Sequence, residues 1–230
     1  MEKNKRLVLF GSREMASLAH FYFAHDSGYE VVGFTVDDSS IDTSEIEGLP
    51  VVAWSEVATR FPPGEHDMFV ALSYRGLNQL RAEKFRQAKD AGYRLASYIC
   101  SKSVTWPDLV AGENCFVLEN QTVQPTCRLG DNVYLWSGNH IGHGSVIEDH
   151  VYLASHIVVS GHCQIGARSF IGVNATLRDF VKIGADCFIA MDASVTQDME
   201  PGSVALGQPA TVHAGDEKMA RMLKRKYFGN

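Results

Sequence analysis

The second half of the chain repeats its apolar positions every six residues. Between Ala111 and Val195, the first position of each six-residue unit is a branched aliphatic residue in fourteen of fifteen units. The fifth position of each unit is mostly small or medium-sized. This period is typical of a parallel β-helix in which three units make one coil. Residues eighteen apart should therefore lie above one another, at the strand spacing of about 4.8 Å.

The first half follows a different pattern. Apolar runs at 6–11 and 29–38 predict strands, and the segment between them, 12–28, predicts a helix that ends at Gly28. The runs LPVVAW, DMFVALS and RLASYI predict further strands, and 76–92 predicts an amphipathic helix. Such alternation indicates a parallel sheet covered by helices.

We therefore expect an α/β fold with three parts. Residues 1–104 should form a Rossmann-like domain, and residues 105–212 a left-handed parallel β-helix. Residues 213–230 should form a short C-terminal helical tail.

Composition narrows the classes of partner. The chain has 230 residues, 45% of them hydrophobic, and a net charge of −6, which is ordinary for a globular protein and gives no basic field to attract nucleic acid. We found no signal peptide and no apolar run long enough to span a membrane, so we expect a cytoplasmic protein without nucleic-acid or membrane partners. The five cysteines lack CxxC spacing, which favours reduced thiols.

Five histidines lie within 140–162, and the six-residue period sorts them. None falls at an inward position, so all five should lie on the outside of the β-helix: His140, His143, His150, His156 and His162. His150 and His156 belong to other faces than His143, which argues against a shared metal site, and we expect no metal.

His143 is the best candidate for a general base. One coil above it lies Gly161, whose backbone N–H could donate to a carbonyl oxygen held beside the imidazole. Imidazole titrates near neutral pH, so His143 could accept a proton from an attacking amine or alcohol. His162 should lie above Gly144, close enough to orient or supplement His143.

Other candidates are suited to bind substrate. In a parallel sheet, ligands bind at the carboxyl ends of the strands, where the chain places candidates for nucleotide binding: Gly11, Ser12, Arg13, Asp37, Asp38, Tyr74 and Arg75. Close to the C-terminus, Arg221, Lys224, Arg225 and Lys226 form a basic helix face that is either a solvated surface or a contact for the phosphate groups of a ligand.

Residues 105–212 resemble the hexapeptide acyltransferases. The whole chain resembles the bacterial nucleotide-sugar acetyltransferases of the sialic-acid O-acetyltransferase and bacillosamine-pathway N-acetyltransferase kind. The motifs that carry the resemblance are VLFG before a helix, the pair Asp37-Asp38, Asn139-His140 leading into Ile141-Gly142-His143, Gly161, and Leu206-Gly207-Gln208-Pro209-Ala210. Gly144 stands where that family usually has an acidic residue, and Tyr152 where it usually has a histidine.

The resemblance implies a homotrimer that binds acetyl-CoA between two subunits and the nucleotide in the N-terminal domain. It implies that His143 is the catalytic base and Gly161 the backbone oxyanion donor, with Asn139 and His140 beside the sugar. For acetyl-CoA itself we select Gly161, Ala190, Gly207 and Pro209.

The favoured hypothesis is an acetyl-CoA-dependent N-acetyltransferase acting on a nucleotide-linked amino sugar, a 4-amino-4,6-dideoxyhexose, for surface glycan biosynthesis. One alternative is O-acetylation of a sialic acid or another sugar. A second alternative, from a different class, is a non-catalytic scaffold that binds sugar nucleotides. Turnover of acetyl-CoA would separate the scaffold from the two enzymes.

Overall fold

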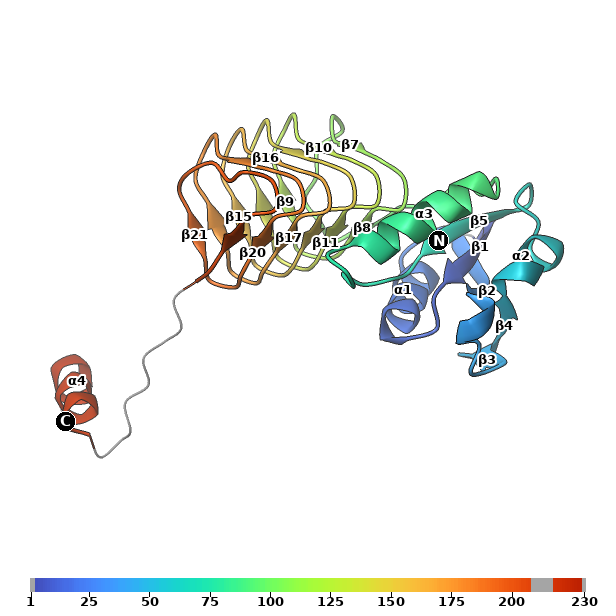
Figure 1. The fold of residues 1–230 in the computed structure, drawn as a ribbon, viewed down its shortest axis with the longest axis horizontal. Helices are drawn as coiled ribbons and strands as arrows, with labels where there is room; N and C mark the ends of the chain where they lie inside the picture. The colour runs from blue at the N-terminus through green and yellow to red at the C-terminus, as the bar shows by residue number, and fades with distance from the viewer. Residues whose placement is uncertain (1–2, 208–216, 229–230) are drawn as a thin grey trace.

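The computed structural model describes residues 3–207 and 217–228. A long stack of coils carries a layer of strands and helices at its N-terminal end (Figure 1). The C-terminal helix α4 (Lys218–Phe228) lies in the segment where a helical tail was predicted. Among the described helices, none has the length and apolar character needed to cross a membrane.

The N-terminal part is built on one five-stranded sheet with the order β3-β4-β2-β1-β5. Strands β4, β2, β1 and β5 run parallel, and β3 pairs antiparallel with β4. The elements are β1 (Lys5–Phe10), α1 (Glu14–His25), β2 (Tyr29–Val36), the 3₁₀ turn η1 (Asp38–Ser40), β3 (Glu45–Ile46), β4 (Leu49–Ala53), α2 (Trp54–Arg60), β5 (His66–Val70) and α3 (Gln79–Asp90).

The prediction of a Rossmann-like domain is wrong: the N-terminal part is a small mixed sheet. After β2 the chain makes a hairpin, in which Glu47 and Gly48 adopt φ of 51° and 75°, so β3 runs antiparallel to β4, while β4 itself is parallel to β2. The predicted strand at 94–99 does not join the sheet as a whole. Leu95 makes one isolated bridge to Met68. The residues that follow, β6 (Tyr98–Ile99), pair instead with the first coil of the β-helix. That coil supplies the backbone hydrogen bonds that β6 would otherwise have to find in the sheet.

The second part is a parallel β-helix, as the six-residue period predicts, and it is consistent with the left-handed form. Each coil contributes one short strand to each of three faces. Face 1 consists of β6, β8 (Phe116–Val117), β11 (Tyr134–Leu135), β14 (Tyr152–Leu153), β17 (Phe170–Ile171), β20 (Phe188–Ile189) and β22 (Val204–Ala205). Face 2 consists of β9 (Thr122–Val123), β12 (His140–Ile141), β15 (Val158–Val159), β18 (Thr176–Leu177) and β21 (Ser194–Val195). Face 3 consists of β7 (Val110–Ala111), β10 (Arg128–Leu129), β13 (Val146–Ile147), β16 (Gln164–Ile165) and β19 (Lys182–Ile183).

The register confirms that residues eighteen apart lie above one another. Tyr134 pairs with Tyr152 on face 1, and His140 pairs with Val158 on face 2. The branched aliphatic column fills the interior and is buried almost completely. The four cysteines of the fifth column lie in the same core, and burial raises the pKa of the Cys115 thiol to about 11. None of these thiols is placed to act as a nucleophile.

The corners between faces explain why histidine recurs in this region. The fourth residue adopts a left-handed backbone in fourteen of the fifteen units, with φ of 65° at His150, 60° at His156 and 57° at His162. Most other residues at this position are Asn, Asp or Gly, the types that tolerate positive φ best, and histidine is also enriched there. For three of the five histidines, the left-handed backbone of the corner is therefore a sufficient reason for the residue type. We call the three edges of the prism the His143, His150 and His156 corners.

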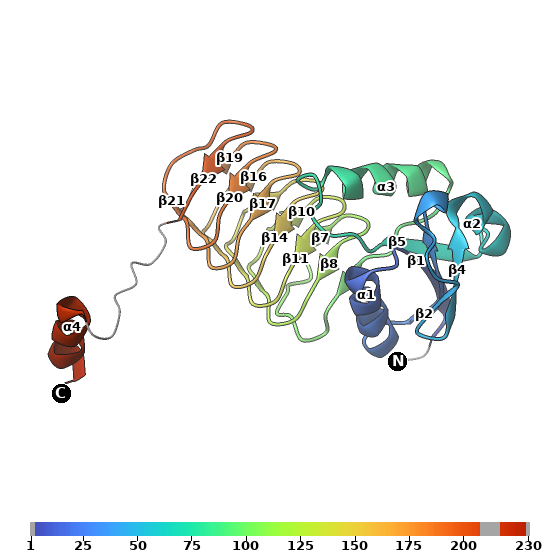
Figure 2. The ribbon, with the colours of Figure 1, turned by 60° about the horizontal axis from the view of Figure 1, so that its bottom comes forward.

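Helix α3 lies beside the first coils of the β-helix (Figure 2), and its contacts place it along the His150 corner, where it joins the two parts. Its N-cap residue Asn78 donates to the carbonyl oxygens of Arg168 and Ser169, and Lys89 at its other end pairs with Glu113. Twelve residues of helix are about 18 Å long, enough to pass three coils at about 4.8 Å each.

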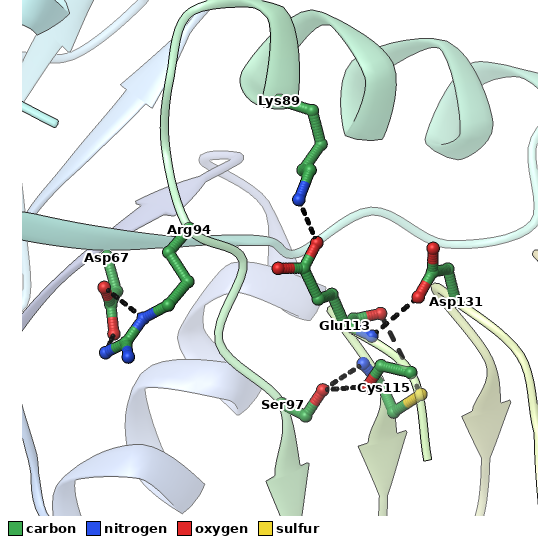
Figure 3. Close-up of polar contacts among 8 residues, drawn as sticks. Asp67, Lys89, Arg94, Ser97, Glu113, Cys115 and Asp131 are labelled. Atoms are coloured by element: carbon green, nitrogen blue, oxygen red, sulfur yellow. Dashed lines mark hydrogen bonds and ion pairs between the residues drawn. The ribbon is translucent and has the colours of Figure 1, made fainter. Parts of the chain in front are cut away.

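The connection between α3 and the first coil is fixed by further polar contacts (Figure 3). Arg94 bonds to Asp67 with two nitrogens, and Ser97 Oγ donates to Gly112 O while accepting from the N–H of Cys115. The two parts also share one apolar core, in which Phe69 and Tyr98 pack with Phe116 of the β-helix. The chain therefore holds its N-terminal part in one orientation on the coils.

Candidate functional site

His143 projects from the His143 corner, between β12 and β13, and its side chain is exposed. Gln124, one coil below, meets it with the side-chain oxygen Oε1. This atom lies 2.9 Å from the backbone N of His143 and 3.1 Å from its Nδ1. The imidazole is thus hydrogen-bonded to Gln124 through Nδ1, while Nε2 lies on the other side of the ring.

Gly161, one coil above His143, lies directly against the imidazole. A Cβ built on Gly161 would lie 2.8 Å from Cε1 of His143 and 3.2 Å from its Nε2, so only glycine lets the ring lie so close to the backbone. The N–H of Gly161 donates to Asp179 Oδ1 at 2.9 Å. As an oxyanion donor, Gly161 would have to exchange this carboxylate for the carbonyl oxygen of a substrate.

His162 completes the group. Its ring meets His143 edge-on, with 4.8 Å between ring centroids, and lies parallel to Phe180 at 5.2 Å. A Cβ built on Gly144 would lie 2.5 Å from Nδ1 of His162. The ring of His162 therefore occupies the space that a side chain at position 144 would need.

The structure thus brings together the three predicted catalytic residues, His143, Gly161 and His162, at one corner. His140 lies on face 2 between Thr122 and Val158, whereas Asn139 is buried. Both polar atoms of the Asn139 side-chain amide are bonded to the backbone: Nδ2 donates to Trp136 O, and Oδ1 accepts from the N–H of Ile157. Within residues 3–207 and 217–228, no three His, Cys, Asp or Glu side chains gather as a metal ion requires.

His150 has a structural environment of its own. It lies under α3, where its Nδ1 is 2.9 Å from Nδ2 of Asn132 and its ring contacts Phe85 edge-on. Burial, and then the positive charge of Arg81, lower the pKa of His150 to about 4. His150 therefore stays neutral in the folded protein through the mildly acidic range.

This environment predicts a pH-dependent stability. The pKa of His150 in the folded state, about 4, lies below its ordinary value of 6.5, so the unfolded chain binds more protons at this group between pH 6.5 and 4. The free energy of unfolding should fall as pH falls through that window, by up to about 3 kcal/mol from this residue. Urea unfolding at several pH values should show a shallower fall for His150→Asn, because Asn does not titrate. Asn is the chosen substitution because it also suits the left-handed backbone of the corner.

His156→Asn is the matched control, since His156 is an exposed histidine at the same position of its unit. An equally shallow pH dependence in both variants would contradict the role assigned to His150.

The candidates for nucleotide binding lie at the carboxyl ends of β1, β2 and β5. Gly11 has φ of 135°, and a Cβ there would lie 2.8 Å from Ala71 O, so the loops after β1 and β5 touch. Asp37 pairs with the buried Lys84 of α3 at 2.6 Å. Arg13 pairs with Asp42 at 2.7 Å, and Ser12 lies between Gly11 and Arg13.

Asp38 Oδ1 accepts the backbone N–H of Ser55 at 3.0 Å, at the start of α2. Hydrogen bonding to Ser55 holds the pKa of Asp38 below its usual range. Tyr74 is 50% exposed and packs edge-on against Tyr152 and Phe170 of face 1, with Arg75 exposed beside it. In one chain these candidates are therefore not gathered around His143, which lies at a different corner.

The candidates for acetyl-CoA are also spread out. Ala190 lies at the His156 corner, and Gly207 packs against Met191 near it. Pro209 lies outside the described residues. The basic residues Arg221, Lys224, Arg225 and Lys226 lie on α4.

Four residues of these sites were missed from the sequence. Phe180 and Asp179 lie eighteen residues after His162 and Gly161, so the coil rule could have found them. Phe180 is 69% exposed and has φ of 65°, an uncommon backbone for a bulky residue. Gln124 lies nineteen residues before His143, and Lys84 resembles an ordinary surface residue of an amphipathic helix, so neither had a clear signal.

No protein-family model matches the chain, and no curated protein matches it. Its fold, in contrast, is similar to several solved structures. The acetyltransferase domain of PglB from Neisseria gonorrhoeae, in complex with acetyl coenzyme A, matches 91% of this chain and 100% of its own, with a TM-score of 0.79 and 22% identity. PerB from Caulobacter crescentus, in complex with CoA and GDP-perosamine, matches 90% of this chain and 97% of its own, with a TM-score of 0.76 and 24% identity. WeeI from Acinetobacter baumannii matches 91% of this chain and 100% of its own, with a TM-score of 0.68 and 18% identity.

The chain shares its fold with these proteins. The likeness covers both the mixed sheet and the β-helix, because it extends over nine-tenths of the chain. It confirms, at the level of fold, the resemblance to nucleotide-sugar acetyltransferases that the sequence motifs indicate.

Proposed function

We propose that the protein is an acetyl-CoA-dependent N-acetyltransferase of a nucleotide-linked amino sugar, with a 4-amino-4,6-dideoxyhexose as the sugar. The observation that carries this proposal is His143, an exposed imidazole that is hydrogen-bonded through Nδ1 and lies against a backbone glycine. The same fold occurs in an acetyltransferase domain solved with acetyl coenzyme A and in PerB solved with CoA and GDP-perosamine.

In the proposed reaction the sugar amine attacks the carbonyl carbon of the acetyl thioester. As the C–N bond forms, the amine proton passes to Nε2 of His143. The C–S bond then breaks, and the CoA thiolate takes the proton from Nε2, so the imidazole returns to its starting state. The N–H of Gly161 would stabilise the negative charge on the carbonyl oxygen, and no covalent acyl-enzyme is needed.

We propose that the protein works as a homotrimer. Because His143 and the nucleotide-binding candidates lie in different parts of one chain, a neighbouring copy is needed to combine them in one site. The homotrimer implied by the family resemblance provides such a copy. Sedimentation of the purified protein should give three times the 25.4 kDa of one chain.

The activity is tested by incubating the protein with acetyl-CoA and 4-amino sugars linked to UDP, GDP or dTDP. Release of the CoA thiol that depends on the sugar nucleotide, with a product heavier by one acetyl group, is the expected result. An amide product resists hydroxylamine, whereas an O-acetyl ester is cleaved by it, which separates N- from O-acetylation. Thiol release that does not depend on any sugar, or no release at all, would favour a non-catalytic scaffold.

Asp37 and Asp38 are expected to bind the nucleotide and to take no part in the chemistry. Changing both to alanine should raise the KM for the sugar nucleotide about 10-fold or more while kcat changes little, as happens when binding is lost equally from ground state and transition state. Steady-state kinetics at saturating acetyl-CoA measures this. Asp90→Ala, at an exposed position at the end of α3, is the control, and an equal fall in kcat and kcat/KM would instead assign the two aspartates to the transition state.

A further inference from the structure

The contact between Gln124 and His143 determines which nitrogen of the imidazole carries the proton. The backbone N–H of His143 can only donate, so the atom of Gln124 that faces it at 2.9 Å has to be the amide oxygen. The same oxygen lies 3.1 Å from Nδ1. Because an amide oxygen only accepts hydrogen bonds, Nδ1 has to be the donor.

The neutral imidazole therefore has its proton on Nδ1 and a free lone pair on Nε2. Gly161 lies against the Cε1 edge of the ring: a Cβ on that glycine would be 2.8 Å from Cε1 and 3.2 Å from Nε2. The lone pair that can accept a proton is therefore close to the backbone group proposed to stabilise an oxyanion.

The group that contacts Nδ1 of His143 is the amide of Gln124 and not a carboxylate. Among the described residues, His162 is a titratable group whose ring meets His143 edge-on, and Asp179 is bonded to the N–H of the neighbouring Gly161. Position 144, where the resembled family usually has an acidic residue, has no free space, because a Cβ there would lie 2.5 Å from Nδ1 of His162. The partner of Nδ1 is a neutral amide from the preceding coil.

We propose that Gln124 is a positioning residue that fixes the Nδ1–H tautomer of His143 and leaves Nε2 as the proton acceptor. This inference rests on the proposed acetyltransferase function for its catalytic meaning, but the tautomer itself can be observed without any substrate. Gln124 also keeps the charge of the site low, since a neutral partner favours the imidazolium form less than a carboxylate does.

The tautomer is tested by NMR of the imidazole nitrogens in ¹⁵N-labelled protein, above the pH at which His143 is protonated. The intact protein should show a protonated Nδ1 and an unprotonated Nε2. In Gln124→Leu this preference should be lost. Gln164→Leu is the matched control, because Gln164 is an exposed glutamine on face 3, and it should leave the spectrum of His143 unchanged.

Kinetics separates positioning from a purely structural role. Gln124→Leu should lower kcat by roughly 10- to 100-fold with little change in the KM for acetyl-CoA. Gln124→Glu preserves both hydrogen bonds and adds a negative charge, so the acidic limb of the pH profile of kcat/KM should move up by about one pH unit or more. His162 and Asp179, two other titratable groups at this corner, are unchanged in all variants. A shift of the pH profile therefore reports on the residue that contacts Nδ1.

A protonated Nε2 in the intact protein would overturn the inference. It would also be overturned if Gln124→Leu kept both the tautomer and kcat, or if Gln124→Glu left the pH profile in place. If no form of the protein turned over acetyl-CoA while the Nδ1–H signal was present and lost in Gln124→Leu, the proposed function would fail and the assignment of the tautomer would stand.

Discussion

His143→Ala should lower kcat by about 10²- to 10⁴-fold, the range expected for loss of a positioned general base. The affinity for acetyl-CoA should change little, because the imidazole is expected to act on the amine proton. Single-turnover and steady-state kinetics with the preferred sugar nucleotide measure the effect. A partial recovery at high pH is expected, since water can then accept the amine proton.

His156→Ala is the matched control for this prediction. His156 is exposed and its ring lies over Gly138, much as the ring of His162 lies over Gly144, but it belongs to another corner. Its loss should leave kcat nearly unchanged. His162→Ala should cause a smaller but measurable loss, because its ring packs against His143. Near-normal turnover in His143→Ala together with no turnover in His162→Ala would show that His162 is the base.

The largest effect on stability is expected at Arg81, which is completely buried between α3 and the β-helix. Its guanidinium donates to Asn132, to Asn78 Oδ1 at 2.9 Å and to His150 O at 3.0 Å, and it lies 4.1 Å from the ring centroid of Tyr134. Burial lowers the pKa of Arg81 to about 10, so it stays charged at neutral pH.

Arg81→Ala should reduce the free energy of unfolding by about 3–5 kcal/mol, because several buried acceptors would lose a charged donor at once. Equilibrium urea unfolding, followed by circular dichroism, measures the change. The control is Arg86→Ala on the same helix, where the side chain is exposed and a change within about 0.5 kcal/mol is expected. Equal effects of the two substitutions would show that the buried network does not stabilise the junction.

Much of the candidate site was predictable because it lies on a repeat. The eighteen-residue rule placed His143, Gly161 and His162 together, and the structure confirms their proximity. The same rule separated His150 and His156 from His143. It did not reveal that α3 covers His150 and lowers the pKa of its imidazole, since nothing in the repeat specifies what packs on the outside.

The sequence by itself determined the β-helix, because each coil contacts mainly the coils eighteen residues away and one periodic pattern satisfies every contact. The form of the N-terminal part was decided only in the tertiary structure. There the chain inserts the short β3–β4 hairpin, and β6 leaves the sheet to pair with the first coil. The local apolar runs predicted a larger parallel domain instead, because such runs do not show which neighbour a strand pairs with. Tertiary structure likewise selected Gln124 as the partner of His143. A polar contact between neighbouring coils depends on side-chain reach and on which atoms can donate or accept, and hydrophobic periodicity carries no information about either.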